Sequence, residues 1–275
     1  MTSTRSLRAG AGLTLVELLV AMTLVATMTA GGLVAYARAN AAWRAQAADQ
    51  RRLERAQYVF GTLEPELQMA GYFAAARPDS PLPEAAIPLP VRHCGAALIA
   101  RIDRAVERLA TLPARCVASA TLLTGSDVLV VRRVSAHASA ARAGRAQWIT
   151  TLDPQPRGEL AWNGQLPPGM QDPELRDLVV RIYYVARSAD GDAGTPALRA
   201  KTLTEIAGAP AFVDTEVMPG VESLRMELLP PDTPQSVRLT LRVRADAADV
   251  DLPDARRALS LTRQFTLRNA PPDAG

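Results

Sequence analysis

One apolar run near the N-terminus constrains this chain more than any other feature of its sequence. The run extends from Leu13 to Ala37, and its only charged residue is Glu17. As a helix, these 25 residues would be about 37 Å long, at roughly 1.5 Å per residue. A bilayer has a hydrocarbon core about 30 Å thick, so the segment is long enough to cross a membrane as a single helix.

A short basic leader precedes the run. It contains Arg5 and Arg8 and ends at Gly12. A secretory signal has a shorter apolar region followed by its cleavage site, so cleavage discards the apolar part; here the leader comes first and the long apolar run follows it. Basic residues ahead of a membrane helix favour a cytoplasmic N-terminus, so we expect the chain beyond Arg38 to lie across the membrane.

The single carboxylate in this run requires an explanation. A charged side chain inside a membrane helix costs about 2.5 to 3.5 kcal/mol on insertion scales and usually faces protein. In one interpretation, Glu17 lies close enough to the helix start to reach the lipid headgroups or to stay protonated. In another, the chain is cut after Gly12, so that Leu13 carries a new α-amino group one helical turn from Glu17. The carboxylate would then pair with the ammonium group of a neighbouring copy and set the register of packed helices.

Residues 12–18, Gly-Leu-Thr-Leu-Val-Glu-Leu, resemble the cleavage and methylation motif shared by type IV prepilins and type II secretion pseudopilins. Leu13 stands where phenylalanine is usual. The resemblance implies that prepilin peptidase cuts between Gly12 and Leu13 and methylates the new amine of Leu13. It also implies that Thr14 and Glu17 act in filament assembly, with the helix packed in a filament core.

The helical pattern continues past the apolar run as far as Met69. A stripe of apolar residues at spacings of three and four predicts a helix half-buried against its own head domain, and a coiled coil would need a longer heptad run. Pro65 is expected to kink or restart this helix. The stripe consists of Leu53, Ala56, Phe60, Leu63 and Leu67, and the charged residues expected to face solvent or neighbouring subunits are Arg51, Arg52, Glu54, Arg55 and Glu66.

Beyond Gly71 the pattern becomes mostly extended. Residues 77–90 contain five prolines and are interpreted as a linker or surface loop, whereas residues 96–112 have a helix-compatible pattern. Residues 188–195 are predicted to form a turn, and a set of arginines is expected on the solvent side of the strands: Arg132, Arg133, Arg238, Arg242 and Arg244. The predicted strands are 127–134, 178–185, 197–203, 223–229, 237–243 and 261–268. One helix and a meandering sheet predict an α+β head.

Four further segments extend the resemblance. Residues 69–73, 125–132, 219–226 and 265–269 are, in this order, similar to the PilW family of type IV minor pilins. That likeness implies a pilin-like fold, in which a long N-terminal helix spans the membrane with its first half and packs on an antiparallel β-sheet head. The family often has a cysteine directly after Gly-Tyr-Phe, where this chain has alanines.

The chain has two cysteines, Cys94 and Cys116. In a head domain outside the cytoplasm, a disulfide between them is the favoured interpretation; it would close a loop of about 22 residues and contribute about 3 kcal/mol. His93 lies beside Cys94, but two cysteines and one nearby histidine fall short of a four-ligand structural metal site, and His137 is distant in the sequence. No metal and no other cofactor is expected.

Catalytic and nucleic-acid signals are weak. Ser126, Asp127 and His137 lack a nucleophile elbow, and no Walker or dinucleotide-binding loop is present, so an enzyme is not expected. The segment Asp190-Gly191-Asp192 lacks the bidentate glutamate of an EF-hand and is interpreted as a hairpin turn. The net charge of +3 falls to about +1 without Arg5 and Arg8, and aromatic residues make up 4% of the chain, so DNA is not an expected partner.

These observations predict a minor pilin that assembles at low copy into a type IV pilus or its tip complex. The expected partners are prepilin peptidase/N-methyltransferase, other minor pilins, the major pilin, the inner-membrane assembly platform and, before assembly, membrane lipid. The expected location is the inner membrane with the head in the periplasm, and then the pilus. Two alternatives are a minor pseudopilin of a type II secretion system and a periplasmic binding or enzymatic domain on an uncleaved anchor. The predicted segments are a leader (1–12), a membrane-spanning half-helix (13–37), an amphipathic half-helix (38–73), a head (74–270) and a disordered tail (271–275).

Overall fold

A computed structural model describes residues 14–82, 87, 91–116, 122–152, 155–188, 194–245 and 258–270. The predicted leader, the cleavage residues Gly12 and Leu13, most of the 188–195 turn and the predicted tail lie outside the described residues. By their contacts the residues form two compact units, 1–48 and 49–275.

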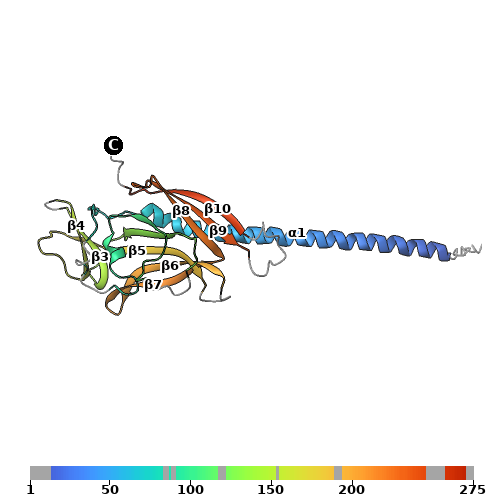
Figure 1. Cartoon of the computed structure of the whole chain (residues 1–275), viewed down its shortest axis with the longest axis horizontal. Helices are drawn as coiled ribbons and strands as arrows, with labels where there is room; N and C mark the ends of the chain where they lie inside the picture. The colour runs from blue at the N-terminus through green and yellow to red at the C-terminus, as the bar shows by residue number, and fades with distance from the viewer. Residues whose placement is uncertain are drawn as a thin grey trace, which may run out of the picture. The chain divides into compact units, whose positions relative to one another are not determined.

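Helix α1 (Leu15–Met69) is a single helix of 55 residues that begins in the first unit and ends in the second (Figure 1). Its apolar side chains from Leu15 to Val34 are exposed. In the described part of the chain it is the one helix that is long and apolar enough to cross a membrane. A long apolar surface without a protein cover favours insertion into lipid, so α1 indicates that the chain is anchored in a membrane.

The helix does not restart at Pro65, because it continues unbroken to Met69. Pro65 lies in the last turn and a half, where its ring is exposed and where only one backbone hydrogen bond of α1 is lost. The predicted apolar stripe is buried at four of its five positions, whereas Leu53 remains 40% exposed. Arg52 and Glu66 are buried, which contradicts their predicted solvent-facing positions.

The larger sheet of the second unit has seven antiparallel strands centred on β5 (Glu174–Arg187). The beginning of β5 pairs with β3, its middle with β2 and its end with β6. The other six strands of this sheet are the partners of β5 and the strands that pair with those partners. They are β1 (Val106–Leu109), β2 (Val128–Val134), β3 (Ala143–Thr151), β4 (Arg157–Asn163), β6 (Pro196–Ile206) and β7 (Ala209–Pro219).

A second sheet of three antiparallel strands is separate from the first, so the predicted single meander was wrong. It consists of β8 (Val221–Leu229), β9 (Ser236–Arg244) and β10 (Ala258–Thr266), which lie side by side in Figure 1. All six predicted strands are present with shifted ends. The predicted turn between β5 and β6 is supported by the N–H of Ser188, which donates to the carbonyl of Thr195 at 2.7 Å.

Both faces of the seven-stranded sheet are buried. On one face, Leu129 and Tyr183 pack with Leu63 of α1 and with apolar residues of β8, β9 and β10. On the other face, Val130 and Tyr184 belong to a separate core that contains both cysteines. Because neighbouring residues of a strand point to opposite faces, these strands are apolar on both sides instead of alternating with polar residues.

The predicted helix over residues 96–112 was wrong. The structure has only a one-turn helix there, α2 (Ala97–Ala100), followed by strand β1. Val106 to Leu109 pair with β2 in register, and Val106 and Glu107 of this strand are buried. The pairing with β2 therefore decides the conformation of a segment whose spacing also suits a helix. The described residues of the predicted loop 77–90 form no helix or strand.

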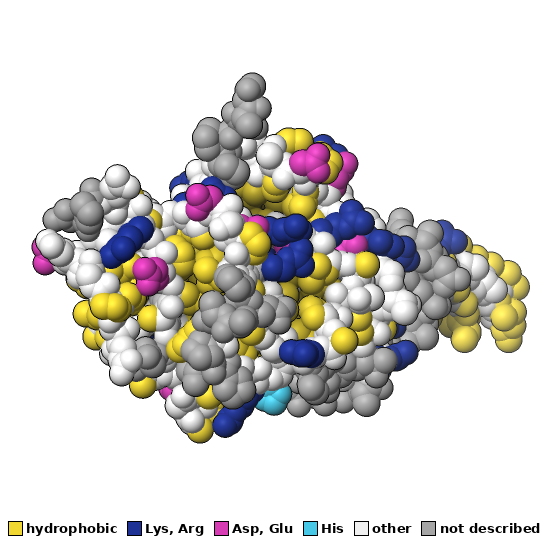
Figure 2. All heavy atoms as spheres, turned by 60° about the vertical axis from the view of Figure 1, so that its left-hand side comes forward, with side chains coloured by type: hydrophobic (Ala, Val, Ile, Leu, Met, Phe, Trp, Pro, Cys, Tyr) yellow, Lys and Arg dark blue, Asp and Glu magenta, His cyan; other side chains and the backbone are white. Residues whose placement is uncertain are grey.

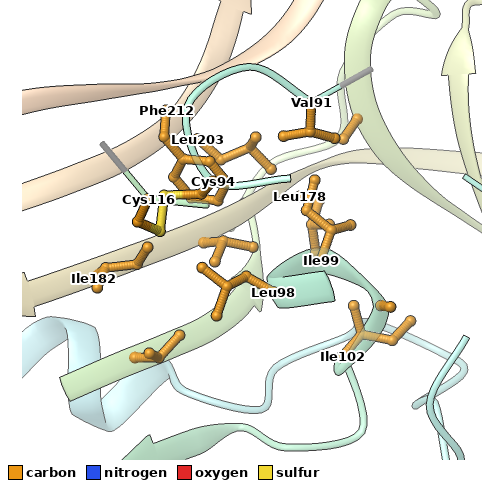
Figure 3. Close-up of a cluster of buried hydrophobic side chains, with 14 of the residues drawn as sticks. Val91, Cys94, Leu98, Ile99, Ile102, Cys116, Leu178, Ile182, Leu203 and Phe212 are labelled. Carbon is orange, nitrogen blue, oxygen red and sulfur yellow. A yellow bond between two sulfur atoms is a disulfide. The ribbon is translucent and has the colours of Figure 1, made fainter. Parts of the chain in front are cut away.

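A disulfide joins Cys94 and Cys116, as predicted. Both cysteines are buried, and the bond lies among apolar side chains that include Phe212 and Leu203 of neighbouring strands (Figure 3). Leu98 and Ile99 of α2 lie in the same cluster. The bond therefore closes a loop that contains α2 and β1, and its buried sulfur atoms pack against one face of the large sheet.

We expect the double variant Cys94→Ala, Cys116→Ala to lower the free energy of unfolding by about 3 kcal/mol, because the unfolded chain loses a loop constraint. Urea unfolding of the full chain in detergent measures this difference. A reductant should lower the stability of the wild type to that of the variant and leave the variant unchanged. Equal stability of the wild type with and without reductant would contradict the prediction.

Candidate functional site

The N-terminal end of α1 is formed around Thr14. Its hydroxyl accepts a hydrogen bond from the N–H of Glu17 at 3.3 Å, and its carbonyl accepts one from the N–H of Leu18 at 3.2 Å. Thr14 is therefore the N-cap, and Glu17 is the third residue of the helix, at capping-box spacing. A carboxylate in the first turn also interacts favourably with the positive end of the helix dipole.

The threonines further along the apolar part of α1 are satisfied within the helix. The hydroxyl of Thr23 donates to the carbonyl of Val20 at 2.8 Å, and that of Thr27 to Leu24 at 2.9 Å. Thr29 donates in the same way to Val25 at 2.7 Å. Such bonds allow hydroxyl groups to lie in an apolar environment without another partner.

Glu17 differs from these threonines. Its side chain is exposed, and in the described ranges its carboxylate makes no hydrogen bond and no ion pair. Thr14 and Glu17 are brought together through the backbone N–H of Glu17. Among the described residues, the start of α1 presents one carboxylate without a partner on an otherwise apolar surface.

The residues of the weak catalytic pattern are not brought together. The hydroxyl of Ser126 accepts the N–H of Leu224 at 2.9 Å and donates to its carbonyl, and Asp127 accepts the N–H of Met226 at 2.8 Å. These bonds attach the segment before β2 to β8. His137 follows β2 at the other end, and a strand of seven residues is roughly 23 Å long.

The sequence reasoning missed a buried ion pair between Arg132 and Glu107. Nη2 of Arg132 lies 2.8 Å from Oε2 of Glu107, and both side chains are almost fully buried. Nε of Arg132 also donates to the carbonyl of Leu98 at 2.7 Å, and Nη1 donates to that of Arg104 at 3.1 Å. Burial lowers the pKa of Arg132, and the Glu107 carboxylate opposes this shift. The predicted solvent position of Arg132 was wrong, because both faces of β2 are covered.

A second ion pair fixes α1 to the large sheet. The carboxylate of Glu66 accepts two hydrogen bonds from Arg133 of β2, at 3.1 and 3.2 Å, and one from Arg181 of β5 at 2.7 Å. The predicted solvent-facing positions of Glu66 and Arg133 were therefore wrong. No signal in the sequence links Glu66 to arginines more than 60 positions away.

A third charged cluster connects β5, β6 and β7. Asp214 accepts hydrogen bonds from Nζ of Lys201 at 2.9 Å, from Nε of Arg199 at 3.1 Å and from the hydroxyl of Tyr184. Lys201 and Asp214 are direct partners in the β6–β7 register. Burial and the hydrogen bond to Asp214 raise the pKa of Tyr184 above its ordinary value.

Of the residues considered as metal ligands and not expected to bind one, Cys94 and Cys116 are held in the disulfide, and His93 lies in a turn with a positive φ of 75°. In the part of the chain that the structure describes, no group of three or more His, Cys, Asp or Glu side chains is arranged to hold a metal ion. The Asp190-Gly191-Asp192 segment lies outside this part.

Comparison of the chain with protein families, with curated proteins and with solved structures finds no match.

We expect Glu66→Gln to lower the free energy of unfolding by about 3 kcal/mol, because it leaves two partly buried guanidinium groups without their counter-charge. Chemical unfolding of the full chain measures the loss. Glu64→Gln is a matched control on the same helix, since Glu64 makes a more exposed ion pair with Arg263 and should change stability by less than about 1 kcal/mol. Equal effects of the two changes would refute the structural role of Glu66.

The raised pKa of Tyr184 predicts a loss of stability in alkali. The folded state favours the neutral phenol, so this contribution is complete below pH about 10, the ordinary pKa of tyrosine, and is lost as the pH rises toward the folded-state pKa. Tyr184→Phe should therefore flatten the fall in melting temperature above pH about 10. An unchanged alkaline slope would count against the burial of this phenol.

Proposed function

We propose that this chain is a minor pilin of a type IV pilus, similar to the PilW family. The observation that carries the proposal is the free carboxylate of Glu17 in the first turn of a long apolar helix. It lies five residues beyond Gly12, at the spacing of the prepilin motif. The α+β arrangement of one long N-terminal helix and antiparallel sheets is compatible with a pilin-like fold.

In the proposed mechanism, prepilin peptidase cuts after Gly12 and the new amine of Leu13 becomes available. The Glu17 carboxylate of one subunit then pairs with the N-terminal ammonium of its neighbour. An unpaired carboxylate in lipid costs about 2.5 to 3.5 kcal/mol, so a subunit that packs in the correct register removes this cost and one in the wrong register does not. Glu17 would thus specify register as well as contribute to affinity.

Two glycines on α1 support close packing by another helix. Gly31 and Gly32 have nothing within 4 Å of the position that a Cβ would occupy, so no packing within the chain accounts for them. Glycine in a helix interior costs about 1 kcal/mol relative to alanine. In membranes, small residues at such positions allow the backbones of two helices to approach closely.

The head is proposed to lie in the periplasm before assembly and to contact other minor pilins in the pilus. The buried disulfide supports this location, because disulfides persist in oxidising compartments. A minor pseudopilin of a type II secretion system shares the same N-terminal chemistry. Deletion of the chain distinguishes the two: loss of surface pili with intact secretion supports the pilin.

We expect Glu17→Val to be cleaved and inserted in the membrane normally but to fail to enter filaments, because the neighbour's ammonium loses its partner. Immunoblotting of sheared filaments and membranes measures the partition. Thr23→Val is the matched control; its hydroxyl is already bonded within the helix, so it should assemble normally. Incorporation of Glu17→Val at the wild-type level would contradict the role of Glu17 in filament assembly. N-terminal sequencing should find Leu13 first, whereas an uncleaved anchor would begin at Met1 or Thr2.

A further inference from the structure

The apolar part of α1 ends at a group of aromatic and basic residues. Its exposed large apolar side chains extend from Leu15 to Val34, over about 30 Å at roughly 1.5 Å per residue. This length matches the hydrocarbon core of a bilayer, which is about 30 Å thick. In Figure 2 the part of α1 at the right of the view shows mainly hydrophobic side chains. We name the next aromatic and charged residues along the helix the interfacial cluster: Tyr36, Arg38, Trp43 and Arg44.

The two aromatic rings of the interfacial cluster are hardly covered by protein. Tyr36 is 70% exposed and Trp43 is 69% exposed. They are seven residues apart, so they lie on the same face of α1, about 10 Å apart along its axis. Rings of tyrosine and tryptophan are favoured where a membrane meets water. Because each headgroup layer is about 5 to 8 Å thick, Tyr36 would lie near its inner edge and Trp43 near its outer edge.

The two arginines of the cluster give this part of α1 an uncompensated positive charge. Between Leu18 and Ala48 the chain has no acidic residue, and Arg38 and Arg44 are its only charged residues there. Both are exposed, and in the described ranges neither guanidinium group makes a hydrogen bond or an ion pair. Their donors are therefore free for anionic oxygens, and the planar guanidinium group suits phosphate in particular.

We propose that the interfacial cluster binds the headgroups of anionic phospholipids. The rings of Tyr36 and Trp43 would lie at the level of the headgroups, and Arg38 and Arg44 would donate hydrogen bonds to the lipid phosphates. Arginines near a membrane surface are attracted to anionic lipids, and no nearby acidic side chain opposes this attraction.

The position of the cluster favours lipid over a protein partner. Tyr36 is only two residues beyond Val34, so it directly continues the apolar surface that indicates membrane anchoring. Lipids that surround the apolar part of α1 would bring their headgroups to this level without a further binding event. The long side chains of Arg38 and Arg44 can also extend along the helix to reach the phosphates.

Lipid binding by the cluster depends on membrane anchoring through α1 and not on cleavage or pilus assembly. The Glu17→Val change leaves all four residues of the cluster in place. A failure of Glu17 to act in assembly would therefore not alter the expected lipid binding, and a lack of lipid preference would leave the Glu17 experiment unaffected.

The depth of the cluster is tested with the full chain in vesicles of phosphatidylcholine and phosphatidylglycerol, by the quenching of tryptophan fluorescence by brominated lipid. Trp148 and Trp162 are buried in the second unit, so the quenching should come from Trp43 and be lost in Trp43→Phe. Bromine at the headgroup end of the acyl chains should quench more strongly than bromine at their methyl end. Equal or stronger quenching from the methyl end would overturn the proposal, as would unchanged quenching in Trp43→Phe.

The lipid preference is tested by moving the bromine from one lipid to the other. At equal mole fractions, brominated phosphatidylglycerol should quench Trp43 at least about twofold more strongly than brominated phosphatidylcholine, and high salt should remove the difference. The double variant Arg38→Ser, Arg44→Ser should lose this preference because it removes both positive charges. Arg268→Ser is the matched control: Arg268 is an exposed arginine of the second unit, outside the cluster, and its loss should leave the preference unchanged.

Melting temperatures equal to that of the wild type establish that the variants are folded. The absence of a preference for phosphatidylglycerol in the wild type would overturn the proposal, as would a wild-type preference in the double variant. An equal loss of preference in Arg268→Ser would also overturn it and assign the effect to the overall charge of the chain.

Discussion

The seven-stranded sheet is apolar on both faces, so other parts of the chain must cover both. The elements that cover them make up most of the rest of the second unit. On one face the cover is α1 together with the three-stranded sheet, with Leu63 and Leu239 among the contact residues. On the other it is the segment from Val91 to Cys116, which carries α2 and the disulfide. A short segment with one helical turn has little structure of its own, and the disulfide restrains it by joining its two ends to each other.

Ion pairs and polar contacts determine which element lies where. Glu66 reaches two strands of the large sheet, Arg132 joins β2 to the segment around α2, and Ser126 ties the start of β2 to β8. Buried ion pairs contribute little net stability compared with well-packed apolar residues, but a misplaced partner is costly. Their physical effect here is to penalise every arrangement in which α1, β1 or β8 is shifted along the sheet.

The apolar part of α1 follows a different rule. In the second unit the carboxylates of Glu66, Glu107 and Asp214 are paired within the chain, whereas the threonines of α1 are satisfied locally and the Glu17 carboxylate has no partner among the described residues. A carboxylate on an otherwise apolar helix makes insertion into lipid less favourable. A partner with a positive group removes this free-energy cost. The Glu17 carboxylate is thus one place where the described part of the chain offers charge to another molecule.

The sequence by itself determined the long apolar helix, the disulfide pair and six of the strands. The helix and the strands follow from periodicity and β-branched runs, which are local signals, and the pairing follows because the chain has only two cysteines. It did not reveal β1, β3, β4 or β7. Strands β3 and β7 contain glycine or proline and lack clear alternation, and they are extended because β5 and β6 pair with them. The burial of Arg132 and Glu66 was likewise decided only by tertiary structure. An arginine in a strand can face water or a buried carboxylate, depending on what covers that face of the sheet. The covering residues are far away in the sequence.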